Sequence, residues 1–240
     1  MLKIVYRTDP DKIAALLPPG ISPGANPNVN LTIYNFPVPD EPEYGIVTSV
    51  DADFDGVAGE FTLGYGIDQE SAIFVSQETN GQPKYPCTTE FYRLGPQIKA
   101  RCIHQGYTFV EFEGVSTGPS GPREPHQQNE WWLKYSRAVS VGGPATDFDF
   151  PPHVVRVRSE YGTAWREEVE GTLVLRDSPW DPLTSLLPMR EQLESYLWWP
   201  TFLDREMTLA GKLDPQAFLP FTDTISGSRW PGTNGGPKRG

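Results

Sequence analysis

The chain has 240 residues, a formal net charge of −11, and 38% hydrophobic and 12% aromatic residues. The negative charge disfavours binding to nucleic acids and to anionic membrane surfaces, and no apolar run reaches the length of about 18 residues that a membrane-spanning helix needs. The 25 prolines and 23 glycines interrupt the chain at short intervals. This composition predicts short strands joined by turns rather than long helices, and therefore a β-rich α+β fold.

The first ten residues, MLKIVYRTDP, lack the long apolar stretch of a secretory signal peptide, so we expect a cytoplasmic protein. The two cysteines, Cys87 and Cys102, form neither a C-x-x-C pair nor a zinc-binding spacing. Two reduced cysteines fit this compartment best, and a single disulfide is the alternative.

The N-terminal segment predicts a strand followed by a short helix. Residues 3–7, KIVYR, have the composition of a strand. In the segment 8–20, Thr8 or Asp9 can cap a helix, and Pro10 fits its first turn, where the missing N–H costs nothing. The Pro-Pro-Gly that follows ends the helix, because a residue before proline is pushed out of helical geometry.

Six segments between residues 29 and 115 have the composition of strands. They are rich in β-branched and aromatic residues, and Gly, Pro, Asp or Asn separates most of them. In chain order they read VNLTIYNF, YGIVTSV, GEFTLGYGI, SAIFVSQE, QIKARCIHQ and YTFVEFEGV. We therefore expect a series of strands in this half of the chain.

The second half alternates between strand patterns and polar connections. Residues 116–130 predict a polar surface loop, with a domain boundary as the alternative, before the strand pattern resumes. Residues 165–176 predict a strand pair or one bent strand, whereas residues 189–213 fit a helix and an alternating strand equally well. We expect one domain over residues 1–220 and a polar, partly disordered tail over residues 221–240.

Motifs for cofactors and metals are incomplete. The G-x-G in LGYGIDQ has Gln69 where a dinucleotide-binding fingerprint has its third glycine, and no helix pattern follows. His104, His126 and His153 each lack a carboxylate or second histidine at ligand spacing, so we expect no metal site. His104 has two interpretations. We favour a strand histidine whose hydrogen bonds are satisfied within the protein, and a side chain that points into a barrel is the alternative.

Two pairs of tryptophans stand out, Trp131–Trp132 and Trp198–Trp199. In a strand, neighbouring side chains point to opposite faces, so one of each pair can reach the core and the other a surface. The favoured interpretation is packing in the core and at a subunit interface, and a substrate pocket is the alternative.

Lys84 has unusual neighbours for a lysine in an acidic chain. It lies in QETNGQPKYP, directly between Pro83 and Tyr85. Lysines are mostly exposed, so local chemistry alone favours a solvated turn. A rigid turn at the end of a buried strand is the alternative, because it would present the amine to a closed pocket.

Several stretches taken together resemble the acetoacetate decarboxylase family. IVYRTDPDKIAALLPPG is similar to the V-Y-R-T-D, short-helix, L-x-P opening of that family. QETNGQPKYP is similar to its R-E-x-x-x-x-P-K block, which holds a Schiff-base lysine. FDGVAGEF, EWWLKYSR and EEVEGTLVLRDSPWDPLTSLLPMRE also correspond in order and spacing, so the resemblance covers residues 3–213.

The resemblance implies a single-domain, closed, cone-like antiparallel β-barrel with surrounding strands and a few short helices, often assembled into homo-oligomers. It implies that Lys84 is catalytic: its amine attacks a ketone, and the imine serves as the electron sink. No metal or organic cofactor is then needed. The residues expected to contact the substrate or to orient the turn are Glu78, Gln82, Tyr85 and Tyr34.

Departures from the family pattern leave the reaction open. Tyr85 stands where the decarboxylases have a second lysine, and Thr32 stands at the place of a family glutamate. The segment 45–49, GIVTS, has no acid at the place of another. We expect a decarboxylase-like Schiff-base lyase acting on a small oxo acid. The alternatives are an aldolase-dehydratase that condenses pyruvate with an aldehyde, and a non-catalytic barrel that binds a small molecule.

Overall fold

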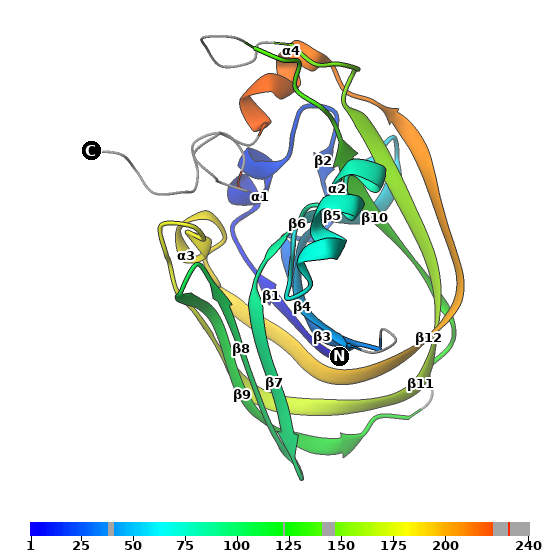
Figure 1. Ribbon diagram of the computed structural model, residues 1–240. Helices are drawn as coiled ribbons and strands as arrows, with labels where there is room; N and C mark the ends of the chain where they lie inside the picture. Colours follow the sequence, from blue (N-terminus) through cyan, green and yellow to red (C-terminus); the bar gives the residue numbers. More distant parts are fainter. Residues whose placement is uncertain (38–40, 122, 141–146, 223–229, 231–240) are drawn as a thin grey trace.

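The computed structural model describes residues 1–37, 41–121, 123–140, 147–222 and residue 230 (Figure 1). Within these residues, one sheet joins twelve strands. The strands are β1 (Leu2–Arg7), β2 (Ser22–Pro23), β3 (Asn28–Phe36), β4 (Glu43–Phe54), β5 (Val57–Ile67), β6 (Lys84–Pro86), β7 (Thr88–Leu94), β8 (Gln97–His104), β9 (Tyr107–Pro119), β10 (His126–Lys134), β11 (His153–Leu175) and β12 (Glu191–Lys212). The helices are α1 (Pro10–Leu16), α2 (Glu70–Asn80), α3 (Leu183–Leu186), α4 (Pro215–Phe218) and the 3-10 helix η1 (Leu219–Phe221).

Seven of the described strands close into a ring. Hydrogen-bonded neighbours follow the order β10-β5-β4-β3-β1-β12-β11, and β10 also pairs with β11, which completes the circuit. Most pairs are antiparallel, whereas β5 pairs in parallel with both β10 and β6. This strand-rich, roughly cone-like ring with few short helices confirms the fold class that the sequence predicts.

The two longest strands shape one wall of the ring (Figure 1). Strand β11 pairs with β10 over residues 153–161 and with β9 over residues 167–175, so it passes from the ring into the outer strands β9, β8 and β7. Strand β12 runs antiparallel beside it. The prediction of one bent strand over residues 165–176 is therefore confirmed, and the ambiguous segment 189–213 forms a strand.

The segment SAIFVSQE, expected as a strand, is instead part of helix α2, so that prediction is wrong. Glu70 lies in the first turn, where a carboxylate favours the helix dipole, and Gly81 ends the helix in a left-handed conformation. The apolar run that suggested a strand is not a buried face. Ile73 is buried, but Phe74 and Val75 are 64% and 65% exposed.

The polar loop expected over residues 116–130 is also largely wrong. Strand β9 continues to Pro119, and β10 already begins at His126. Gln127 and Gln128 pair with Glu160 and Ser159 of β11, so their main-chain groups are used in the sheet. Backbone pairing across the ring therefore outweighs the low strand propensity of these polar residues.

The wall of the ring separates an apolar core from the ring interior. On β1, Leu2, Ile4 and Tyr6 belong to the main hydrophobic core, which also contains residues of α1, β8 and β9. Lys3 alternates with them and therefore faces the other side of the sheet. Among the described residues, none of the helices has the length and apolar character that a membrane-spanning helix requires.

Two further expectations concern residues in the core. Cys87 and Cys102 are buried and form no disulfide. His104 is buried and its Nδ1 lies 2.7 Å from Oδ2 of Asp181, so the satisfied strand histidine is confirmed. Within the expected tail 221–240, Trp230 is fully buried, with its Nε1 3.4 Å from Oδ1 of Asp181; residues 223–229 and 231–240 lie outside the described residues.

Candidate active site

Helix α2 ends in a turn that leads directly to Lys84. Gly81 adopts φ 68° and ψ 18°, and its N–H donates to the carbonyl of Gln77 at 2.9 Å. The bond from Gly81 is that of an αL motif, and the N–H of Gln82 also donates to the carbonyl of Ser76 at 3.3 Å. A Cβ at Gly81 would lie 2.5 Å from the carbonyl oxygen of Leu133 on β10. Only glycine allows this helix end to pack so closely on the sheet.

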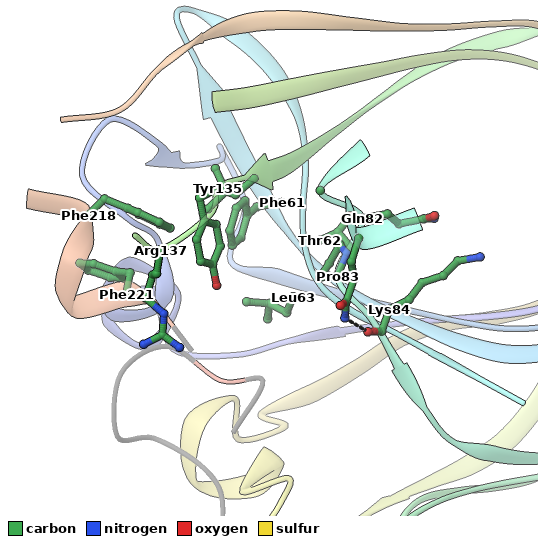
Figure 2. A pocket seen from close by; sticks show the side chains of 13 residues that line it. Phe61, Thr62, Leu63, Gln82, Pro83, Lys84, Tyr135, Arg137, Phe218 and Phe221 are labelled. Atoms are coloured by element: carbon green, nitrogen blue, oxygen red, sulfur yellow. Dashed lines mark hydrogen bonds between the residues drawn. The ribbon is translucent and has the colours of Figure 1, made fainter. Parts of the chain in front are cut away.

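The main chain around Lys84 is held from two sides. The N–H of Tyr65 on β5 donates to the carbonyl of Pro83 at 2.9 Å. The side-chain amide of Gln77 donates to the carbonyl of Lys84 (Figure 2). Strand β6 also pairs in parallel with β5, with Lys84 opposite Tyr65. The helix and the sheet therefore fix where the lysine side chain leaves the backbone.

Two cavities adjoin this turn. One of about 300 Å³ is lined by Phe61, Tyr135, Arg137, Phe218 and other residues, among them Lys84 and further residues of the ring strands β5 and β10. Figure 2 shows that the side chain of Lys84 extends away from Phe61, Tyr135, Arg137 and Phe218. The other, of about 370 Å³, is lined by residues from all seven strands of the ring, so it lies in the ring interior. One lining residue from each strand is Lys3, Thr32, Val47, Tyr65, Trp132, Tyr161 and Met207.

A buried ion pair holds the amine of Lys84 in the second cavity. Its Nζ lies 3.5 Å from Oε2 of Glu43, and the two side chains are only 11% and 12% exposed. The hydroxyl of Tyr34 donates to Oε1 of Glu43 at 2.7 Å. Burial, together with the neighbouring carboxylate of Glu43, raises the pKa of Tyr34 well above its ordinary value. The phenol therefore stays protonated and fixes one oxygen of Glu43, while the other faces the amine.

A second carboxylate of the cavity, Glu130, is almost fully enclosed. It accepts hydrogen bonds from the hydroxyl of Tyr65 and, at 3.3 Å, from Nε1 of Trp132. The guanidinium of Arg205 lies 3.9 Å away. Burial raises the pKa of Glu130, although the hydrogen bond from Tyr65 and the charge of Arg205 oppose the shift. At a given pH, a larger fraction of this carboxyl group is therefore protonated than in an exposed glutamate.

A third carboxylate of the same cavity, Glu60, is also occupied by hydrogen bonds. It accepts from Nε2 of Gln128 at 2.8 Å and from the hydroxyl of Ser49. The cavity thus combines three glutamates with the cations of Lys84, Lys3 and Arg205. Because its wall carries side chains of both charges, the cavity suits a polar substrate whose charged group can pair with a side chain of opposite sign.

Aromatic side chains form much of the remaining wall. Tyr65 and Trp132 pack edge to face at 5.9 Å between ring centroids, and Tyr161 packs on Trp198 at 5.2 Å. Both tryptophans line the cavity, whereas Trp131 belongs to the main core. The core interpretation is therefore confirmed for Trp131 and Trp132, both of which are buried in hydrophobic clusters, and Trp132 and Trp198 also line the cavity.

The sequence-predicted residues divide into two groups. Lys84, Gln82 and Tyr34 all line the cavity inside the ring. Glu78 is exposed on α2 and lies outside the lining of this cavity. Tyr85 is buried in the main core, with its ring 4.8 Å from that of His104. Because Tyr85 follows Lys84 in a strand, it points to the opposite face.

The sequence reasoning missed three residues of the site. Glu43 is the first residue of β4 and directly precedes the predicted strand YGIVTSV, so an acid at the start of that segment was the available signal. Lys3 lies between the buried apolar residues Leu2 and Ile4, and this was the signal, because a charged residue in such a strand indicates a polar interior on the other face. Glu130 lies between Asn129 and Trp131, so the pattern there was weaker.

Comparisons with known proteins agree with this geometry. The family model described as Acetoacetate decarboxylase (ADC) matches residues 1–213. No match was found among curated proteins. A solved acetoacetate decarboxylase is 16% identical, with 88% of this chain and 86% of that chain covered and a TM-score of 0.73.

Two further solved structures extend the likeness. The acetoacetate decarboxylase of Legionella pneumophila subsp. pneumophila str. Philadelphia 1 is 16% identical, with 88% of this chain and 82% of that chain covered and a TM-score of 0.68. The enduracididine biosynthesis enzyme MppR, solved with the condensation product of pyruvate and imidazole 4-carboxaldehyde, is 17% identical, with 86% of each chain covered and a TM-score of 0.64. At these identities the likeness to solved structures concerns the fold.

Proposed function

Because the chain belongs to the acetoacetate decarboxylase family, we propose that it is a Schiff-base-forming lyase that acts on a small oxo acid through Lys84. The observation that carries this proposal is the position of the amine. It lies in a cavity lined by residues of all seven ring strands, 3.5 Å from the carboxylate of Glu43, and the lysine side chain has little exposure to solvent. A surface lysine that served only solubility would have no such surroundings.

Imine formation requires one proton acceptor beside the amine, and Glu43 fills that role. Glu43 takes a proton from the ammonium of Lys84, and the neutral amine then attacks the carbonyl carbon of the substrate. A C–N bond forms as the carbonyl π bond opens, and the oxygen takes a proton from the attacking nitrogen to become a hydroxyl. Glu43 then returns its proton as this hydroxyl leaves as water, which gives the protonated imine. Tyr34 holds Glu43 in place through these transfers, because its hydroxyl stays protonated.

Cleavage then uses the protonated imine as the electron sink. In decarboxylation of a 3-oxo acid, the bond between the carboxylate and the α-carbon breaks and carbon dioxide leaves. The electron pair moves to the imine nitrogen and gives an enamine. Protonation of the enamine carbon and hydrolysis of the imine release the ketone and restore Lys84.

The size and walls of the cavity favour a second candidate reaction, aldol condensation followed by dehydration. A volume of about 370 Å³ with Trp132, Tyr161 and Trp198 in its wall leaves room for a ring-bearing partner beside a three-carbon acid. Here the pyruvate imine loses a methyl proton to give the enamine, which attacks an aldehyde carbonyl, and the hydroxyl leaves as water. MppR has been solved with a condensation product of pyruvate and an aldehyde.

Product analysis separates these reactions. The protein is incubated with acetoacetate, with release of carbon dioxide and acetone measured, and separately with pyruvate plus an aromatic aldehyde, with the condensation product measured by mass spectrometry. Lys84→Ala and Lys84→Arg are expected to abolish whichever product forms, since neither side chain can form the imine. Lys99→Ala, at an exposed lysine paired with Glu113, is the control and is expected to retain full activity. Ligand binding without turnover that survives Lys84→Ala would instead support a non-catalytic binding barrel.

A further inference from the structure

Lys3 and Lys84 stand at the two ends of one continuous row of paired residues. The row runs Lys3, Thr32, Val47, Tyr65, Lys84, and each member lies directly opposite the next on five adjacent strands, β1, β3, β4, β5 and β6. Directly opposed residues point to the same face of a sheet. All five line the cavity inside the ring.

The curvature of the ring brings the two lysine side chains into the same interior. Four steps between strands span roughly 19 Å along the sheet, at about 4.8 Å a step. Because the sheet closes on itself, the straight path between Lys3 and Lys84 is shorter than this arc, and both long side chains extend from the wall inward. Both side chains therefore border the space that a ligand in this cavity would occupy.

The ammonium of Lys3 has more N–H donors than the described residues have acceptors for it. Lys3 is only 9% exposed, and its Nζ donates to Oγ1 of Thr32 at 2.8 Å. An ammonium carries three N–H donors, and within the described residues Thr32 is its one hydrogen-bond acceptor, with no carboxylate at ion-pair distance. A buried charge with donors left over is costly unless something else binds them.

The neighbouring glutamates do not provide that partner. Glu60 accepts from Ser49 and Gln128, and Glu130 accepts from Tyr65. Their charge still acts at longer range. Burial lowers the pKa of Lys3, but Glu60, Tyr196, Tyr161 and Glu130 together raise it by more, so that its pKa lies above the ordinary value and the side chain stays charged.

The other cation of the cavity wall, Arg205, is less suited to receive a substrate anion. Its side chain is 36% exposed, and its guanidinium lies 3.9 Å from a carboxylate oxygen of Glu130. Lys3 is more deeply buried, and a desolvated ammonium attracts an anion more strongly than an exposed guanidinium that already has a carboxylate beside it.

We propose that Lys3 binds the carboxylate of the substrate while Lys84 holds its carbonyl carbon as the imine. This inference rests on the proposed function and adds a substrate class: oxo acids whose carboxylate stays ionised across the cavity from Lys84. It makes Lys3 the residue that distinguishes an oxo acid from a neutral ketone of the same shape. Thr32 is then a positioning residue, because it holds the ammonium through Oγ1.

The test compares acetoacetate with its neutral methyl ester. Each is incubated with the protein and borohydride, and the rate of covalent labelling of Lys84 is followed by intact mass and peptide mapping. The variant Lys3→Met removes the charge and keeps an unbranched apolar side chain. It is expected to slow labelling by acetoacetate about 10- to 100-fold, the range for loss of a hydrogen bond to a charged group. The rate of labelling by the ester in Lys3→Met is expected to differ from the wild-type rate by less than about twofold, because the ester has no charge for Lys3 to bind.

Two further variants keep the test decisive. Lys3→Arg retains a cation and is expected to retain the preference for the acid over the ester. Thr32→Val leaves the ammonium but removes its acceptor, and it is expected to weaken the preference less than Lys3→Met does. Undiminished labelling by the ester shows that a variant is folded. Should Lys3→Met fail to fold, Thr32→Val carries the test, and an unchanged acid preference in it would overturn the inference.

The outcomes separate this inference from the proposed function. Suppose that the wild-type protein is labelled at Lys84, and that Lys3→Met either slows labelling by the acid and by the ester equally or changes neither rate. Lys3 is then not the carboxylate-binding residue, and the proposed lyase function stands. If the wild-type protein labels with neither compound, the comparison is repeated with pyruvate and its methyl ester, and both proposals fail if these also give no label. Loss of labelling by the acid alone supports both.

Discussion

The carboxylate of Glu43 lies 3.5 Å from the amine of Lys84, in a cavity where both side chains are nearly excluded from solvent. Glu43 opens β4, and Lys84 opens β6, which follows the turn after α2. The pair therefore joins two strands that are both neighbours of β5. This arrangement gives the amine a proton acceptor that does not depend on solvent.

Replacing Glu43 tests its role in proton transfer. Glu43→Gln keeps the shape of the side chain but cannot accept the proton, so we expect imine formation to slow by about 10²- to 10⁴-fold, the usual effect of removing a general base. The measurement is the rate of borohydride-dependent labelling. Glu113→Gln, at an exposed ion pair with Lys99, is the control. A rate for Glu43→Gln equal to that of the control would show that another group takes the proton.

Tyr34→Phe is expected to disturb the same carboxylate more mildly. It removes the hydroxyl that donates to Oε1 of Glu43 at 2.7 Å, and hydrogen bonds to charged groups are worth about 1.5–3 kcal/mol. We expect lower stability in urea unfolding and slower labelling of Lys84, with the label on the same residue. In a double variant with Glu43→Gln, the effect on the labelling rate should be much smaller. If the effects of Tyr34→Phe and Glu43→Gln on the labelling rate simply added in the double variant, Tyr34 would not act through Glu43.

The turn before Lys84 should tolerate no side chain at Gly81. Gly81→Ala places an L-residue at φ 68° and a Cβ 2.5 Å from a main-chain oxygen of Leu133. Gly95→Ala is the matched control, since Gly95 has φ 60° and open space around its Cβ position. The control should cost roughly 1–2 kcal/mol for the left-handed backbone alone. Gly81→Ala should cost more in denaturant unfolding and should also slow labelling of Lys84. Equal effects of the two variants would contradict the close packing of α2 on β10.

Glu130 should give the protein a distinctive dependence on pH. Burial raises its pKa, so the folded state binds a proton that the unfolded chain releases. The free energy of unfolding should therefore fall as pH rises from the ordinary glutamate value to the raised value. Glu130→Gln removes this contribution, and its stability relative to wild type should increase with pH across that window. Denaturant unfolding at several pH values measures the difference. A difference that is flat or falls with pH would contradict the raised pKa.

The sequence predicts the parts of this protein that depend on local pattern. Alternating strands and proline turns are local features, and they lead to the strand-rich fold. The assignment of Lys84 as the candidate nucleophile rests on the family resemblance, because local chemistry alone favours a solvated turn. Helix α2 was missed because its run Ile73-Phe74-Val75 resembles a strand. The expected homo-oligomer stays a prediction.

The rest of the site depends on contacts between distant segments. Glu43 and Lys84 are separated by 41 residues, and the row that joins Lys3 to Lys84 exists only because five strands pair in one register. A shift of one residue in any strand would turn its member of the row to the other face. Tyr85 illustrates the same dependence, because its neighbour Lys84 lines the cavity while Tyr85 itself packs in the core.

The proposed lyase chemistry requires that Lys84 forms an imine with an oxo acid. The decisive measurement is borohydride trapping with acetoacetate and pyruvate in separate reactions, read by intact mass and peptide mapping. We expect a stable adduct on Lys84 with at least one of the two acids, absent from Lys84→Ala and Lys84→Arg and unchanged in Lys99→Ala. An adduct that persists in Lys84→Ala, or no adduct with either acid, would contradict it.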